Sequence, residues 1–124
     1  MANILIVDDS PTELFQLKEM LEKHGHTVLT AENGADGVAL CRQEQPDAVL
    51  MDIVMPNLNG FQATRQLTKA SETAHIPVII ITTKDQETDR VWGMRQGASD
   101  YLSKPIREDV LLKTLNSVME AAPA

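Results

Sequence analysis

Three short stretches of this sequence are apolar at every position, and they limit the possible folds more than any other feature. They are Ile4–Val7, Ala48–Met51 and Val78–Ile81. A strand with one face in water alternates apolar and polar residues, whereas a strand covered on both faces by helices is apolar throughout. The three stretches therefore predict central strands of a parallel sheet that is buried on both sides.

Weaker strand signals and helical segments fill the intervals between these strands. Thr27–Ala31 and Tyr101–Leu102 are less apolar and are expected as outer or edge strands. Helices are expected over 11–24, 34–44, 60–76, 86–96 and 107–121. Five strands and five helices in strict alternation predict an α/β fold, a doubly wound five-stranded parallel sheet with helices on both faces.

The first of these helices carries a start signal and a stop signal. Ser10 is an expected N-cap, Pro11 occupies the first helical position, and Glu13 is placed to close a capping box with Ser10. Gly25 follows the last apolar position and is expected to end the helix.

Length and composition narrow the class of protein. A chain of 124 residues predicts one domain, 1–124. Its net charge of −7 argues against nucleic acid or an anionic membrane as the main partner, because both need a basic face. Cys41 is the only cysteine, the first residues lack the basic region and long apolar run of a signal peptide, and no apolar stretch reaches membrane-spanning length. We therefore expect a cytoplasmic protein.

Chemically active residues follow four of the expected strands. Asp8 and Asp9 end the first strand, Asp52 the third and Thr82 the fourth, and Lys104 follows the fifth. In a doubly wound sheet, ligands bind outside the carboxyl ends of the strands. The three carboxylates, the hydroxyl and the ammonium are therefore expected to share one pocket.

The charges in this pocket call for a divalent cation. Two carboxylates about 4 Å apart repel each other by about 4 kcal/mol at an effective dielectric near 20, and one lysine cannot neutralise three of them. Oxygen ligands select Mg²⁺, Mn²⁺ or Ca²⁺ over zinc, and we expect Mg²⁺ because it binds through one or two carboxylates and accepts a phosphoryl oxygen as a ligand. A cation, a lysine and a hydroxyl together stabilise a phosphoryl group in transfer, and a carboxylate can accept that group as an acyl phosphate.

Each of these residues alone has an ordinary explanation. Asp8 and Asp9 could favour the positive end of the following helix, Asp52 could open a turn, and Lys104 could be a surface lysine. Their joint placement at the strand ends favours the phosphoryl-transfer site.

The same residues, in order and spacing, resemble the receiver domain of two-component response regulators over essentially the whole chain. The residues that carry the resemblance are Asp8-Asp9, Asp52 with Met55-Pro56 and Gly60, Thr82, and Lys104-Pro105. The resemblance implies a flavodoxin-like (CheY-like) three-layer αβα fold. The length of 124 residues predicts a stand-alone receiver of this kind, without an output domain.

The resemblance assigns roles to individual residues. It implies that Asp52 accepts the phosphoryl group and that Mg²⁺ is held by Asp8, Asp9, Asp52 and the backbone carbonyl of Val54. Further implied roles are phosphoryl contacts by Thr82 and Lys104, an aromatic switch at Tyr101, and a cis peptide bond between Lys104 and Pro105.

The resemblance also implies partners. A sensor histidine kinase of the chemotaxis type would donate the phosphoryl group, and a downstream protein would bind the face formed by the fourth helix, the fifth strand and the fifth helix. The chain would be a monomer and not an enzyme, and would either pass a signal on or act as a phosphate sink. The stretches 21–26, 59–68 and 82–88 resemble receivers of twitching-motility (type IV pilus) signalling.

Two residues depart from the chemotaxis-type pattern and are expected to set the lifetime of the phosphoryl group. Val54 lies two positions after the acceptor, and Lys84 lies two positions after Thr82. An apolar Val54 would hold a hydrolytic water poorly, and Lys84 would contact the phosphoryl group or block access to it.

Three other functions agree less well with the sequence. A phosphatase with an aspartyl-phosphate intermediate would need a second aspartate where Val54 stands. A flavin-binding domain would need a phosphate-binding loop, where Asp8 and Asp9 would instead repel the flavin phosphate. A degenerate receiver that docks without phosphorylation would not need the complete set of site residues.

Overall fold

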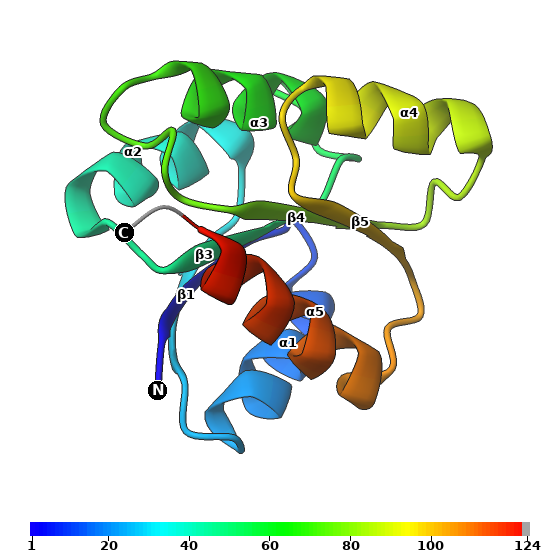
Figure 1. Ribbon diagram of the computed structural model, residues 1–124. Coiled ribbons are helices and arrows are strands. Elements are labelled where there is room, and N and C mark those ends of the chain that lie inside the picture. Colours follow the sequence, from blue (N-terminus) through cyan, green and yellow to red (C-terminus); the bar gives the residue numbers. More distant parts are fainter. Residues whose placement is uncertain (123–124) are drawn as a thin grey trace.

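The three apolar stretches form the inner strands of a five-stranded parallel sheet in the computed structural model, which describes residues 1–122 (Figure 1). The strands are β1 (Asn3–Val7), β2 (Thr27–Ala31), β3 (Ala48–Met51), β4 (Val78–Thr82) and β5 (Asp100–Ser103). Their order is β2-β1-β3-β4-β5, so the two weaker strands lie at the edges as predicted. The chain changes direction across the sheet between β1 and β3, where ligands bind in doubly wound folds.

Five helices alternate with the strands, which confirms the predicted doubly wound fold. They are α1 (Pro11–Glu22), α2 (Gly34–Glu44), α3 (Gly60–Lys69), α4 (Glu87–Arg95) and α5 (Glu108–Ala121). Figure 1 shows α1 and α5 on one face of the sheet and α2, α3 and α4 on the other.

Successive residues of β1 point to opposite faces of the sheet and pack in two different hydrophobic clusters. Ile4 and Ile6 point toward α1 and α5, whereas Leu5 and Val7 point toward α2 and α3. They pack with helix residues of the same clusters, which are Leu14, Leu17, Leu21, Leu111 and Leu115 on the first face and Val38, Cys41, Ala63 and Leu67 on the second. Burial on both faces is the physical reason for the unbroken apolar pattern.

Helix α3 is shorter than predicted, because it ends at Lys69 rather than just before Pro77. Ala70 is extended, with φ −79° and ψ 132°. The Thr73 hydroxyl then donates a 2.6 Å hydrogen bond to the carbonyl of Leu67. A side-chain donor therefore satisfies a carbonyl that another helical turn would have used.

The predicted capping box at the start of α1 is only half formed. The Ser10 hydroxyl accepts a hydrogen bond from the backbone N–H of Glu13, but the Ser10 N–H donates to the Asp8 carboxylate at 2.9 Å. The Glu13 carboxylate binds the Lys104 ammonium instead. A complete capping box is present at α3, between Asn59 and Gln62.

Within residues 1–122, no helix is both long enough and apolar enough to cross a membrane.

Candidate functional site

Strand pairing brings two aspartates together at the carboxyl end of the sheet. Asp8 follows β1 and donates its backbone N–H to Ala31 of β2 at 3.1 Å. Asp52 follows β3 and donates its backbone N–H to Val7 of β1 at 2.9 Å. Because β1 and β3 are neighbours, these bonds carry the sheet one residue further and set both carboxylates at the same edge.

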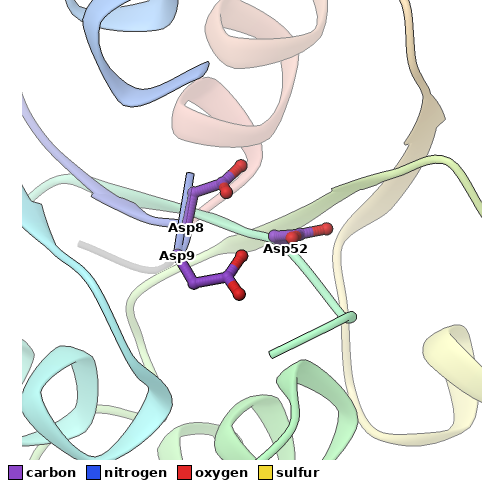
Figure 2. A group of neighbouring side chains, drawn as sticks. All are labelled: Asp8, Asp9 and Asp52. Atoms are coloured by element: carbon purple, nitrogen blue, oxygen red, sulfur yellow. The ribbon is translucent and has the colours of Figure 1, made fainter. Parts of the chain in front are cut away.

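Asp9 completes a group of three carboxylates, drawn in Figure 2. One oxygen from each of Asp8, Asp9 and Asp52 lies within 4.8 Å of the others. Asp8 and Asp52 are buried, whereas Asp9 is exposed. The group therefore has two fixed members and one open to solvent, a suitable arrangement for a metal ion that exchanges with solution.

Lys104 supplies positive charge to the site. Its ammonium Nζ donates to Asp8 Oδ2 at 2.8 Å and to the Glu13 carboxylate, and it lies 3.8 Å from Asp52 Oδ1. The residue follows β5, and its backbone N–H bonds the carbonyl of Thr82 in β4 at 2.8 Å. The peptide bond between Lys104 and Pro105 is cis.

The ionised form of Asp52 is disfavoured in the site. The pKa of Asp52 is raised to about 6, mainly by burial and further by the charges of Asp8 and Glu13, against the opposing effects of Lys104 and of the Ile53 backbone N–H at 2.9 Å. Burial lowers the pKa of Lys104, but hydrogen bonds to Asp8 and Glu13 outweigh this effect and hold it above its ordinary value. Ionised Asp52 is thus only partly compensated by the ammonium.

The donor set fits a hard divalent cation. All three side chains offer carboxylate oxygens, and no histidine or cysteine belongs to this group within the described residues. Such oxygen ligands suit Mg²⁺, Mn²⁺ or Ca²⁺ and not zinc. A divalent cation would also stabilise the ionised form of Asp52, which burial and the neighbouring carboxylates disfavour.

The side chains of Thr82 and Tyr101 both form hydrogen bonds with the backbone of Lys84, in the loop between β4 and α4. The Thr82 hydroxyl oxygen accepts a hydrogen bond from the Lys84 N–H at 3.3 Å. The Tyr101 hydroxyl donates to the Lys84 carbonyl at 2.7 Å. Both side chains are buried, so the backbone of Lys84 joins the Thr82 hydroxyl to the aromatic residue of β5.

The two residues expected to set the phosphoryl lifetime are open to solvent. The Val54 side chain is about half exposed, and Lys84 is exposed. Val54 directly follows Ile53, whose N–H binds the Asp52 carboxylate.

Sequence reasoning missed two residues of the site. Glu13 was assigned to helix capping, and its contact with Lys104 joins residues 91 positions apart, which no local pattern could reveal. No motif of the sequence includes Gly93, yet a Cβ there would lie 2.9 Å from both Ile80 Cδ1 and a Tyr101 ring carbon. A glycine inside a helix is an unfavourable residue, and that was the one available signal.

Gly60, at the start of α3, lies close to the backbone of Asp52. A Cβ on Gly60 would lie 2.0 Å from the backbone carbonyl oxygen of Asp52. The first turn of α3 can therefore pack against the Asp52 backbone only with glycine at this position.

Comparisons with known proteins agree with this geometry. The sequence profile of the response regulator receiver domain matches residues 4–116. Protein PilH of Pseudomonas aeruginosa is 76% identical over 119 residues, which cover 96% of this chain and 98% of PilH. Response regulator PleD of Caulobacter vibrioides is 40% identical over 90% of this chain, which spans only 24% of PleD.

Solved structures give the same result. The chemotaxis protein CheY4 of Vibrio cholerae superposes with a TM-score of 0.89 at 30% identity, covering 95% of this chain and 98% of CheY4. The match in sequence profile, the identity to PilH and the shared fold all lead to one conclusion: this chain belongs to the response regulator receiver domain family.

Proposed function

We propose that this response regulator accepts a phosphoryl group on Asp52 from a histidine kinase and thereby changes its affinity for a partner protein. The observation that carries the proposal is the position of Asp52. Its buried carboxylate shares a group with Asp8 and Asp9 and lies 3.8 Å from the Lys104 ammonium.

The chemistry of transfer follows from the ionisation of Asp52. With a pKa of about 6, its carboxylate is mostly ionised at pH 7 and can act as a nucleophile. A carboxylate oxygen forms a bond to phosphorus, the bond between phosphorus and the donor histidine nitrogen breaks, and the electron pair returns to that nitrogen. The product is an acyl phosphate on Asp52.

The remaining residues stabilise the transferred group. Lys104 neutralises charge on one phosphoryl oxygen, and the Thr82 hydroxyl can donate its proton to another while accepting from the Lys84 N–H. Asp8, Asp9, Asp52 and the Val54 backbone carbonyl would hold Mg²⁺, or Mn²⁺ in its place. The ion, when bound, neutralises the charge that develops on the phosphoryl oxygens.

The receiver is proposed to act on itself without turning over a diffusible substrate. Phosphotransfer to Asp52 and later hydrolysis of the acyl phosphate are each single events on this chain. Val54 and Lys84 are proposed to govern the second event, because they flank the acceptor and Thr82 in the sequence and are open to water.

The output surface is proposed to be the face of α4, β5 and α5. Thr82 and Tyr101 share Lys84 as a hydrogen-bond partner, so movement of the hydroxyl toward a phosphoryl oxygen would alter the support of Tyr101 in β5. Trp92 on α4 is about half exposed and offers an aromatic contact for a downstream protein.

The pathway is proposed to be the control of type IV pilus twitching motility. The support is the resemblance of the stretches 21–26, 59–68 and 82–88 to receivers of that signalling system, together with 76% identity to Protein PilH. A strain that carries Asp52→Asn would show altered twitching if the receiver acts there. Unchanged twitching in that strain would refute this assignment.

Intact mass measurement tests the acceptor and the metal together. The chain is incubated with acetyl phosphate, with and without Mg²⁺, beside Asp52→Asn and the control Asp109→Asn, an exposed aspartate of α5. We expect the parent and the control to gain one phosphoryl group only with Mg²⁺, and Asp52→Asn to gain none. A gain on Asp52→Asn, or a gain without Mg²⁺, would contradict the proposal.

A further inference from the structure

The Lys104 ammonium is shared by two carboxylates that differ in how firmly they are held. Asp8 accepts from it at 2.8 Å with its side chain only 2% exposed, whereas the Glu13 side chain is 36% exposed. Lys104 itself is 11% exposed, so its charge is largely enclosed by these groups. Glu13 can release the ammonium into water at little cost, but Asp8 cannot.

The Glu13 carboxylate has no competing role in the helix that carries it. The Ser10 hydroxyl caps α1 through the backbone N–H of Glu13, and the Ser10 N–H is taken by Asp8 at 2.9 Å. The carboxylate that would have closed a capping box is therefore free to reach across to Lys104.

The contact has an electrostatic consequence for the acceptor. Glu13 places a negative charge close enough to Asp52 to contribute to its raised pKa. A phosphoryl group on Asp52 brings further negative charge and needs an N–H of Lys104, which lies 3.8 Å from Asp52 Oδ1 when Glu13 is bound. Two of the three N–H groups of Lys104 donate to Asp8 and Glu13, and these bonds hold the ammonium 3.8 Å from Asp52, so Glu13 and the phosphoryl group compete for the position of the ammonium.

We propose that Glu13 is a positioning residue that holds Lys104 back from Asp52 until a phosphoryl group displaces it. This inference rests on the proposed function, because it concerns the same phosphoryl site. Glu13 lowers the affinity of the site for the phosphoryl group, and its release accompanies phosphorylation. The contact between Glu13 and Lys104 therefore favours the unphosphorylated state of the receiver.

Glu13→Gln tests the competition, because it removes the charge and keeps the shape. The probe is beryllofluoride, a phosphoryl mimic, titrated by calorimetry in the presence of Mg²⁺ into the full chain. Glu19→Gln is the matched control, since Glu19 is an exposed glutamate on the same helix. Thermal unfolding of each variant verifies that it is folded.

We expect Glu13→Gln to bind beryllofluoride about three- to fivefold more tightly than the parent, the upper range for a partly exposed ion pair. Glu19→Gln should change the beryllofluoride affinity by less than half of the fold-change expected for Glu13→Gln. In a Lys104→Gln background, Glu13→Gln should have no effect beyond that of Glu19→Gln, because the ammonium for which Glu13 competes is gone.

Three results would overturn the inference while leaving the proposed function intact. They are equal effects of Glu13→Gln and Glu19→Gln, weaker binding in Glu13→Gln, and a gain that persists in the Lys104→Gln background. A parent that neither binds beryllofluoride nor gains a phosphoryl group would instead refute the proposed function, and this inference with it.

Discussion

The Tyr101 hydroxyl donates a hydrogen bond to the backbone carbonyl of Lys84, 2.7 Å away. The N–H of the same Lys84 donates to the Thr82 hydroxyl. One loop residue therefore joins the last residue of β4 to the aromatic ring of β5. A change at Thr82 needs to move only one residue of backbone to reach Tyr101.

Gly93→Ala tests whether α4 provides the space for the Tyr101 ring. The added Cβ would lie 2.9 Å from Ile80 Cδ1 and 2.9 Å from a ring carbon of Tyr101, so the ring must shift. Overpacking costs about 1–3 kcal/mol, against which alanine recovers up to about 1 kcal/mol of helix propensity. We expect a loss of about 1 kcal/mol in the free energy of unfolding by urea, and loss of the NOEs between the Tyr101 ring and Ile80.

Tyr101→Phe is the control for this variant. It should lose about 1 kcal/mol through the missing hydrogen bond to Lys84 while the ring keeps its NOEs to Ile80. If Gly93→Ala leaves those NOEs unchanged, the close approach of α4 does not hold the ring in place.

Asp52→Asn should stabilise the metal-free protein at neutral pH. The folded-state pKa of about 6 exceeds the ordinary value of 3.8, so the folded state keeps a proton that the unfolded state releases. The parent therefore loses stability as the pH rises from about 4 to about 6, and the full penalty of about 3 kcal/mol is present above that range. Asparagine does not titrate and avoids the penalty.

Urea unfolding in EDTA at pH 7 and at pH 4 measures this difference. Asp52→Asn should exceed the parent by about 2–3 kcal/mol at pH 7, and by little at pH 4. A difference that is the same at both values would mean that burial of the Asp52 charge is not its cause.

Asp9→Asn should weaken Mg²⁺ binding without loss of the fold. Asp9 is the exposed member of the three-carboxylate group, so its removal leaves buried Asp8 and Asp52 in place. At a Mg²⁺ concentration of about 100 times the dissociation constant, binding stabilises the parent by about 2.7 kcal/mol. The thermal unfolding midpoint of the parent should rise with Mg²⁺, and that of Asp9→Asn should rise far less.

Asp109→Asn is the matched control for that titration, since Asp109 is an exposed aspartate paired with Arg107. It should respond to Mg²⁺ like the parent. Equal responses of Asp9→Asn and the parent would remove Asp9 from the metal site.

Val54→Asn and Lys84→Glu should each shorten the life of the phosphoryl group. A polar side chain at 54 can hold the hydrolytic water, and a carboxylate at 84 no longer shields the phosphoryl group. We expect autodephosphorylation about tenfold faster in each, a change of about 1.4 kcal/mol in the barrier. Lys84→Glu keeps the backbone carbonyl that binds Tyr101, so the switch contact remains as an internal control. Rates equal to the parent would refute the idea.

Much of the fold could be predicted because its signals are local. Consecutive apolar residues indicate that both faces of β1, β3 and β4 are buried. The alternation of strands and helices indicates a parallel sheet. The end of α3 could not be predicted in this way. It depends on the Thr73 hydroxyl reaching the Leu67 carbonyl, a contact that helical periodicity does not contain.

The chemical groups of the site could be predicted from the sequence: carboxylates, a hydroxyl and an ammonium follow the strands of a parallel sheet. Residue type alone sets which groups can bind a cation or a phosphoryl oxygen. The partners of Lys104 depend on the folded chain, because Asp8 and Glu13 lie more than 90 positions away in the sequence. The same limit applies to Gly93 and the Tyr101 ring, since close approach between α4 and β5 is a property of packing and leaves no periodic trace in the chain.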